Sequence, residues 1–364
     1  MRQTASYPLH GGQLRRIAEQ FGIPASQLLD FSANINPDGP PAAALSAIRN
    51  GLSDLSALTE YPDLEEIELR ESIARYVGMA AECISVANGF VPLLEVVLRT
   101  LGIRNCMLPV PSFVEYRRTL KRVGIEMTIH PLIAELGFRY DPTAMLDGKC
   151  DAILLANPQN PSGVCRDASE IRELVALALQ KNVYVLLDEA FIDYVPEQSL
   201  TRMTTEFPNL IVFRSVTKFH GLPGLRIAYV VTNTVLFQSI NENIAPWLIT
   251  TLASRAVSAA LDDQTYADRS RAVNSDRRNA LQRNIQALGL SVYPSEANFL
   301  LFQLPLGIDP DYFWHYLITQ HGIVLRSCAN YDGLSAGHFR VAIRADSENA
   351  ILAAALAEAV SHEC

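Results

Sequence analysis

The sequence predicts an α/β protein that has a mainly parallel sheet in a large domain and a second, smaller α+β domain. Over the first two thirds of the chain, short apolar runs alternate with helical stretches, which is typical of a parallel sheet. The run Ala152–Ala156 is apolar throughout, as expected for a strand that helices cover on both faces. From about Pro246 a long polar-rich helix and several short strands follow, which indicates the second domain.

The spacing of apolar residues predicts each element in turn. After an arm over residues 1–40, we expect helices over 45–52 and 64–77, a strand over 83–86 and a helix over 92–101. A strand over 105–109 and a helix over 113–123 follow, then strands over 152–156, 183–187 and 210–213, with a helix over 169–181. The smaller domain is predicted to contain a helix over 262–288 and strands over 291–293, 299–302, 323–326 and 339–343.

Composition excludes several classes of protein. The 364 residues suit about two domains, and 49% hydrophobic with 19% charged residues exclude a disordered, collagen-like or coiled-coil chain. The net charge of −9 argues against a nucleic-acid partner. No stretch approaches the roughly 18 apolar residues of a membrane span, and no apolar signal segment follows residues 1–4. The six cysteines form no CxxC pair, so we expect no metal site, reduced thiols and a cytoplasmic protein.

Three chemically distinct side chains follow three of the predicted strands. Asn160 comes after the strand over 152–156, Asp188 after the strand over 183–187, and Lys218 after the strand over 210–213. Because ligands of α/β proteins bind at the carboxyl ends of strands, we expect these side chains to meet. Taken singly, a turn residue, a helix cap and a surface lysine explain them as well. Together they form the set that pyridoxal 5′-phosphate requires, since its aldehyde needs an amine and its ring nitrogen an acid.

The motifs around these residues resemble a known superfamily. Asn-Pro-x-Asn-Pro-Ser-Gly contains Asn160, Asp-Glu-Ala-Phe begins at Asp188, and Ser-x-Thr-Lys ends at Lys218 with Arg226 eight residues further on. In this order they resemble the fold-type I pyridoxal phosphate enzymes of the aspartate aminotransferase superfamily, over nearly the whole chain. The resemblance implies a seven-stranded, mainly parallel sheet in a large domain over residues 46–250. An arm with part of the small domain would occupy residues 1–45, and the small C-terminal domain residues 251–364.

The resemblance also implies a role for each matching residue. Lys218 would bind the cofactor aldehyde, Asp188 would pair with the ring nitrogen, Asn160 would bond the 3-hydroxyl, and Phe113 would stack on the ring. A homodimer with a shared active site is implied as well, because Tyr61 matches a tyrosine that reaches the neighbouring subunit's cofactor. Phe90 stands where related enzymes commonly carry a small, acidic or hydroxyl residue. The cofactor phosphate would be bound by Asn88, Gly89, Phe90, Val91, Ser215, Thr217, Arg226 and Tyr61.

Two branches of this superfamily act on phosphorylated amino substrates: histidinol-phosphate aminotransferases and L-threonine-O-3-phosphate decarboxylases. Segments 10–12, 30–37, 188–193, 326–331 and 339–344 resemble the decarboxylase branch. Arg340 matches the position that binds the substrate carboxylate, and Arg326 matches the position that contacts the substrate phosphate in both branches, since an arginine fork suits both anions. His10, Asn34 and Asn160 would provide further substrate contacts.

The activity implied is decarboxylation of L-threonine O-3-phosphate to (R)-1-amino-2-propanol O-2-phosphate and CO₂ for cobalamin biosynthesis. Three alternatives stay open at this point. The first is an aminotransferase of the histidinol-phosphate type, although Phe191 stands where many aminotransferases have tyrosine. The second is a decarboxylase of L-serine O-phosphate, which one methyl group distinguishes by only about 1–3 kcal/mol. The third is a pyridoxal phosphate-binding regulatory protein. Neither a nucleic acid nor a membrane is expected as a partner.

Overall fold

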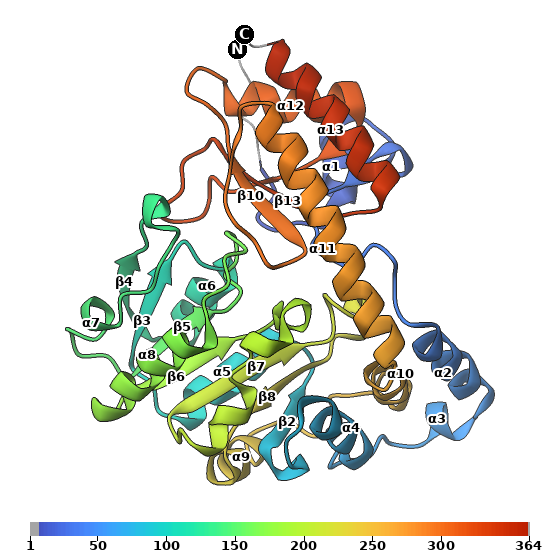
Figure 1. Ribbon diagram of the computed structural model, residues 1–364. Coiled ribbons are helices and arrows are strands. Elements are labelled where there is room, and N and C mark those ends of the chain that lie inside the picture. Colours follow the sequence, from blue (N-terminus) through green and yellow to red (C-terminus); the bar gives the residue numbers. More distant parts are fainter. Residues whose placement is uncertain (1–6, 363–364) are drawn as a thin grey trace.

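A seven-stranded sheet forms the centre of the larger part of the protein (Figure 1). The computed structural model describes residues 7–362, so residues 1–6 of the predicted arm and residues 363–364 lie outside the described chain. Six strands run in one direction and β8 runs against both of its neighbours. The predicted fold class is therefore confirmed. The strand order is β2 (Ile84–Ala87), β8 (Ala228–Val231), β7 (Leu210–Ser215), β6 (Tyr184–Asp188), β5 (Ala152–Ala156), β3 (Asn105–Val110) and β4 (Glu126–Pro131).

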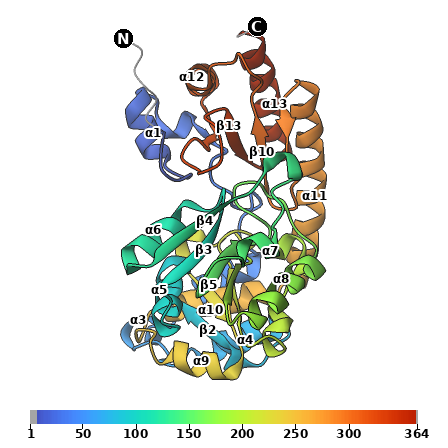
Figure 2. The ribbon, with the colours of Figure 1, turned by 90° about the vertical axis from the view of Figure 1, so that its left-hand side faces the viewer.

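Helices cover both faces of this sheet, which explains the apolar strands. In β5, Ile153 and Leu155 belong to the hydrophobic cluster of α8 (Ala168–Gln180), whereas Leu154 belongs to the cluster of α5 (Phe90–Thr100) and α6 (Val114–Val123). Successive side chains of a strand point to opposite faces, so both sets must be apolar. Figure 2 shows α5 and α6 on one side of the sheet and α8 on the other.

Two strands of this sheet were missed from the sequence. β4 is an edge strand, and its exposed Glu126 and Thr128 interrupt the apolar pattern on which the prediction depended. β8 was missed because it has only four residues and directly follows the motif around Arg226, although those four residues are apolar. The predicted helix over 262–288 corresponds to α11 (Gln264–Ala287), which begins after Asp263 because the Asp263 side chain accepts a hydrogen bond from the Tyr266 amide.

A second layer of helices packs against β2 and β8. Helices α2, α4 and α10 share one hydrophobic cluster with these strands. The predicted division between residues 250 and 251 falls just before α10, and the domain boundaries stay a prediction. Helices α3, α7 and α9 complete the surface of this unit. The bounds of these six helices are Ala42–Ser53 for α2, Ser56–Thr59 for α3, Ile67–Val77 for α4, Pro142–Met145 for α7, Thr234–Asn241 for α9 and Thr251–Leu261 for α10.

The smaller unit contains an antiparallel sheet with helices packed against it. Its strand order is β12 (Arg326–Ser327), β13 (His338–Ala342), β10 (Phe299–Gln303) and β9 (Ser291–Val292). The core beneath α11, α12 (Pro310–His321) and α13 (Asp346–Ser361) includes the fully buried Trp314, whose indole N–H donates to the Leu325 carbonyl at 3.1 Å. This unit lies above the large sheet in Figure 1, and α11 extends from one unit to the other.

The N-terminal segment joins the smaller unit. Strand β1 (Leu29–Asp30) pairs in parallel with β11 (Ile323–Val324), and Ile17 of α1 (Leu14–Phe21) lies in the same core as Trp314. After β1 the chain passes down to α2 on the larger unit, so residues 31–41 connect the two units. Short 3₁₀ helices lie at Ala25–Gln27, Ala81–Cys83, Ala134–Leu136, Ile192–Tyr194, Pro196–Gln198, Thr201–Thr205 and Pro223–Leu225.

Two predictions from composition can be compared with the described residues. Within residues 7–362 no helix is both long enough and apolar enough to cross a bilayer. The five described cysteines are free thiols, and no group of three His, Cys, Asp or Glu side chains suited to a metal ion occurs in the same part of the chain. The cytoplasmic location stays a prediction.

Candidate active site

A cavity of about 360 Å³ lies at the carboxyl ends of the parallel strands, between the two units. All three of the singled-out side chains line it: Asn160 and Lys218, which follow β5 and β7, and Asp188, which is the last residue of β6. The adjacency of these strands therefore brings together the three side chains that the sequence singled out. The other predicted site residues that line the cavity are His10, Asn34, Gly89, Phe90, Val91, Phe113, Ser215, Thr217, Arg226, Arg326 and Arg340.

Two predicted cofactor-binding residues do not line this cavity. Asn88 is exposed, and Tyr61 is 81% exposed with its ring 4.9 Å from the ring of Trp247. The structure therefore does not bring Tyr61 to its own chain's Lys218. Its predicted role depends on a second subunit.

The environment of Lys218 makes its amine easier to deprotonate. Burial, together with the nearby cations Arg340 and Arg226, lowers the pKa of Lys218 to about 8, although Asp188 opposes the shift. An amine acts as a nucleophile only when it is neutral, so a lowered pKa suits a lysine that must react with an aldehyde.

Asp188 is buried at the end of β6 and is held by two hydrogen bonds. Its Oδ2 accepts from the Tyr116 hydroxyl at 2.5 Å, and its Oδ1 accepts from the Ala190 amide at 2.9 Å. Burial raises the pKa of Asp188 to about 6, against the effect of both hydrogen bonds, which favour the ionised form. Asp188 is therefore mostly ionised at neutral pH and fixed in orientation. Tyr116 was not predicted from the sequence, although it stands three residues after Phe113 on the same predicted helix.

An anion-binding corner lies at the start of α5. Gly89 has φ +95° and precedes the first turn of α5, whose amide groups have no side-chain cap. A Cβ at Gly89 would lie 2.8 Å from Nη2 of Arg226, so only glycine lets this guanidinium approach the helix start. The hydroxyls of Ser215 and Thr217 are 2.9 Å apart in the same cavity. Amides, hydroxyls and a guanidinium together suit a phosphate group.

Two buried arginines enter the cavity from the smaller unit. Arg326 and Arg340 are directly paired across the antiparallel strands β12 and β13, and both side chains line the cavity. Their exposed fractions are 3% and 6%. Burial lowers the pKa of Arg326, and the neighbouring Arg340 contributes to the same shift. Like charges placed opposite each other across two strands destabilise a sheet, so this pair indicates a site for anions.

Each arginine is held by neutral oxygens. Nη1 of Arg340 donates to Oδ1 of Asn160 at 2.6 Å and Nη2 donates to the Ser32 carbonyl at 3.2 Å. Nη2 of Arg326 donates to the Leu9 carbonyl and to Oδ1 of Asn330, both at 2.8 Å. Within residues 7–362 neither arginine forms an ion pair, and the buried Nε of Arg340 has no partner there. Both positive charges are therefore oriented but not neutralised.

The N-terminal segment closes one side of the cavity. Nε2 of His10 lies 2.9 Å from Oε1 of Glu115, and Glu115 also pairs with Arg118 at 3.2 Å. Burial lowers the pKa of His10, against the attraction of Glu115. Oδ1 of Asn34 is buried without a partner among the described residues. Glu115 also lines the cavity. It was not predicted as a site residue, because in the sequence it is only one polar residue on a predicted helix.

This set of groups fits pyridoxal phosphate. One cavity contains an amine with a lowered pKa, an ionised carboxylate and an anion-binding corner. The aldehyde, the ring nitrogen and the phosphate of that cofactor require these three groups. Phe113 lies beside Tyr116 with the rings perpendicular, and Phe90 packs against Tyr116 and Phe213. Stacking of Phe113 on a bound ring stays a prediction.

Comparisons with known proteins identify the family. The family described as aminotransferase class I and II matches residues 26–357. The threonine-phosphate decarboxylase of Salmonella typhimurium is 34% identical over 352 residues, which cover 95% of each chain. Histidinol-phosphate aminotransferase 2 of Pseudomonas aeruginosa is 30% identical over 370 residues, which cover 99% of this chain and 97% of that protein.

A solved structure agrees in fold. The histidinol-phosphate aminotransferase from Clostridium acetobutylicum superposes with a TM-score of 0.85 at 27% identity, over 92% of this chain and all of that one. The extent of these matches, from near the N-terminus to near the C-terminus, leaves no large part of the described chain unaccounted for. The protein belongs to the aminotransferase class I and II family.

Proposed function

We propose that this protein is a pyridoxal 5′-phosphate-dependent carboxy-lyase that converts L-threonine O-3-phosphate to (R)-1-amino-2-propanol O-2-phosphate and CO₂. The observation that carries the proposal is the pair of buried, unneutralised arginines, Arg326 and Arg340, opposite each other in the cavity that contains Lys218. The 34% identity with a threonine-phosphate decarboxylase supports the same reading. The product would serve cobalamin biosynthesis.

The spacing of the two arginines favours a small substrate with two anionic groups. Residues paired across antiparallel strands have Cα atoms about 4.5–5.5 Å apart, so the two arginine side chains extend from adjacent positions on the backbone. L-Threonine O-3-phosphate carries a carboxylate on Cα and a phosphate on the adjacent carbon's oxygen. Histidinol phosphate carries a phosphate but no carboxylate, so on its own it would leave one buried arginine without an anion. An aminotransferase would fill the pair only with its second substrate, the dicarboxylate 2-oxoglutarate, so the dependence of turnover on that keto acid distinguishes the two functions.

Arg340 is the residue we assign to the carboxylate. Asn160 and the Ser32 carbonyl fix its guanidinium, and its buried Nε has no partner among the described residues. Arg326, with His10 and Asn34 nearby, is assigned to the substrate phosphate. A carboxylate held by a fixed arginine has a fixed orientation relative to the rest of the cavity, which is the geometric condition for breaking one chosen bond at Cα.

Lys218 and Asp188 are assigned to the cofactor. When bound, pyridoxal phosphate supplies an electron sink for the charge that remains on Cα as CO₂ departs. Asp188, oriented by Tyr116, would keep the ring nitrogen protonated, and Gly89 with Arg226 would hold the phosphate. The bond from Cα to the carboxylate breaks, CO₂ leaves, and Cα takes up a proton. Lys218 is the candidate proton donor, because its amine lies in the same cavity.

Turnover without a keto acid tests this function. We expect protein loaded with pyridoxal phosphate to release CO₂ from L-threonine O-3-phosphate and form aminopropanol phosphate through many cycles, measured by mass spectrometry. The ratio of kcat/KM for L-threonine O-3-phosphate to that for L-serine O-phosphate measures the contribution of the methyl group, which is about 1–3 kcal/mol. If no CO₂ appears and histidinol phosphate instead requires 2-oxoglutarate for turnover, the protein is an aminotransferase.

The two arginines should be separable by ligand. Arg326→Gln should weaken binding of both threonine phosphate and aminopropanol phosphate, whereas Arg340→Gln should weaken binding of threonine phosphate only, because the product has no carboxylate. Loss of one buried charged partner costs about 2–4 kcal/mol, or roughly 30- to 1000-fold in affinity. Isothermal titration of the cofactor-free protein with both ligands measures this, because that protein does not consume the substrate. Equal weakening of the product by both substitutions would contradict the assignment.

The pH dependence of cofactor affinity tests Asp188 and Tyr116. A cationic ring nitrogen lowers the pKa of Asp188 below its cofactor-free value of about 6, so affinity is complete above that pH and decreases as the pH falls through it. Tyr116→Phe removes a hydrogen bond that lowers the Asp188 pKa, so the decrease should begin at higher pH.

Dissociation constants for pyridoxal phosphate between pH 5 and 8, measured by fluorescence, give the result. Asp188→Asn is the control. The ratio of its dissociation constant to that of the wild type cancels the cofactor's own ionisations, so this ratio should change with pH only through Asp188. An unchanged midpoint in Tyr116→Phe would show that this hydrogen bond does not tune the carboxylate.

We also propose a homodimer with a shared active site. Large apolar side chains are exposed on neighbouring segments from α2 to the start of α4, and the ring of Tyr61 contacts Trp247 beside them. Such a patch on a described surface is typical of an interface with another protein chain. A second copy would cover it and bring its Tyr61 toward this chain's cofactor phosphate. The exposed residues are Leu52, Leu55, Leu58, Tyr61, Leu64, Ile67 and Trp247.

Sedimentation equilibrium tests this arrangement. We expect twice the 40.1 kDa chain mass for the wild type and the mass of a single chain for Leu55→Asp, with weaker cofactor binding. Leu306→Asp is the matched control, because Leu306 is fully exposed on the smaller unit, away from the patch. A monomeric wild type that binds the cofactor normally would refute the shared site.

A further inference from the structure

Asn36 belongs to the segment 30–37 that resembles the decarboxylase branch, yet neither the resemblance nor the cavity assigns it a role. It lies on the connection between the two units, after Ser32 and Asn34. Its side chain is 6% exposed. A buried amide on a connecting segment must find hydrogen-bond partners, and the identity of those partners indicates what it does.

Asn36 binds directly to the backbone of the lysine-bearing turn. Its amide N–H donates to the Lys218 carbonyl at 3.0 Å, and its side-chain Nδ2 donates to the Phe219 carbonyl at 3.0 Å. The same Nδ2 lies 2.9 Å from the Tyr266 hydroxyl and 3.1 Å from the Ser270 hydroxyl, both on α11. One side chain therefore joins the turn after β7, the connecting segment and the long helix.

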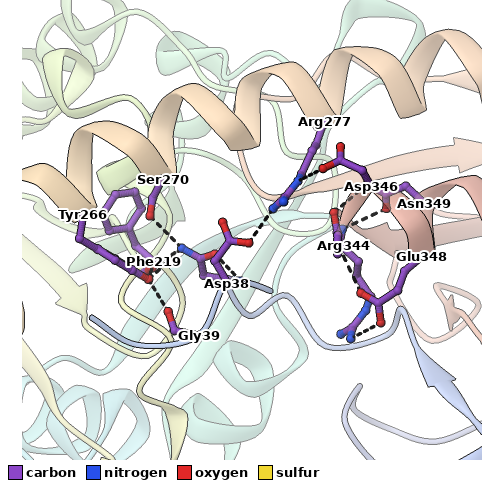
Figure 3. Close-up of polar contacts among 12 residues, drawn as sticks. Asp38, Gly39, Phe219, Tyr266, Ser270, Arg277, Arg344, Asp346, Glu348 and Asn349 are labelled. Carbon is purple, nitrogen blue, oxygen red and sulfur yellow. Dashed lines mark hydrogen bonds and ion pairs between the residues drawn. The ribbon is translucent and has the colours of Figure 1, made fainter. Parts of the chain in front are cut away.

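Tyr266 reinforces the same junction. Its hydroxyl lies 2.7 Å from the Gly39 carbonyl and 3.0 Å from the Phe219 carbonyl. The backbones are in close contact here, since a Cβ on Gly221, which has φ +62°, would lie 2.8 Å from the carbonyl carbon of Gly39. Figure 3 shows Tyr266 and Ser270 projecting from α11 toward Phe219 and Gly39.

The other end of the connecting segment reaches the substrate side of the cavity. The Ser32 carbonyl accepts from Nη2 of Arg340, and Asn34 lines the cavity. Only three residues separate Ser32 from Asn36. The group assigned to the substrate carboxylate and the backbone of Lys218 are thus connected through one short, buried stretch of chain.

We infer that Asn36 and Tyr266 are positioning residues, which fasten the Lys218–Gly221 turn to the connecting segment and to α11 and so fix the Lys218 amine relative to Arg340. This inference rests on the proposed function, in which Lys218 and Arg340 act on the same substrate. Displacement of a reacting group by about 1 Å lowers the rate as much as 100-fold while the binding contacts remain. The expected effect is therefore on turnover more than on substrate affinity.

The experiment compares Asn36→Ala and Tyr266→Phe with Asp38→Asn. Asp38 lies on the same connecting segment and pairs with Arg277 of α11 at 3.0 Å, but its side chain has no described contact with the Lys218 turn. We expect kcat to fall 10- to 100-fold in Asn36→Ala and three- to tenfold in Tyr266→Phe, with KM within threefold of the wild type. Asp38→Asn should keep both within twofold.

A second readout needs no activity. In cofactor-free protein, competitive chemical labelling of Lys218 over a pH range should give a higher midpoint in Asn36→Ala, because a loosened lysine moves away from Arg340 and Arg226. Hydrogen exchange of the peptide that contains Lys218–Gly221 should accelerate in the same variant. A purely structural role would lower the melting temperature without moving the labelling midpoint of the folded protein.

The outcomes separate this inference from the proposed function. Wild-type kcat in folded Asn36→Ala, or unchanged labelling and exchange, would overturn the positioning role. If Asn36→Ala does not fold, Tyr266→Phe decides, since it keeps the ring and loses only the hydroxyl. If the wild type fails to decarboxylate threonine phosphate, the proposed function fails while labelling and exchange still test the link to Lys218.

Discussion

The site depends on a concentration of positive charge at the carboxyl edge of the large sheet. Lys218, Arg226, Arg326 and Arg340 line one cavity, and within residues 7–362 none of them forms an ion pair with a carboxylate. Arg326 and Arg340 are also buried, and buried charges without partners are costly, so this pair indicates that anionic ligands complete the site. Two phosphate groups and one carboxylate, from cofactor and substrate, would supply the missing charges. Burial, and then the neighbouring Arg340 and Arg226, lower the pKa of Lys218.

The two units contribute different parts of this cluster. The large sheet places Asp188 and Lys218 at fixed strand ends, and the start of α5 adds the corner at Gly89 and Arg226. The small sheet adds Arg326 and Arg340 from paired strands. Reaction geometry therefore depends on how the units are joined. The junction of Asn36, Tyr266 and the Lys218–Gly221 turn is where the connecting segment, α11 and the large sheet meet, which gives it a role in that geometry.

Much of the fold could be predicted because its signals are local. The apolar run of β5 and the helical spacing of α8 reflect burial on one or two faces, and the structure confirms both elements. β4 was missed because an edge strand tolerates polar residues such as Glu126 and Thr128. In the site, Asn160, Asp188 and Lys218 were found through their positions after strands. Tyr116 and Glu115 were missed because a side chain on an amphipathic helix gives no sign of which strand end it faces.

The sequence by itself determined the chemistry that is available: an amine, a carboxylate and an amide after three buried strands, and two arginines in the last third of the chain. Only the tertiary structure decided their relationships. The register of β12 against β13 makes Arg326 and Arg340 neighbours, and burial raises the pKa of Asp188 to about 6 although the hydrogen bond from Tyr116 lowers it. The tertiary structure also joins Asn36 to a turn more than 180 residues away in the sequence. Pairing, burial and charge proximity arise between segments distant in the chain, so no local pattern contains them.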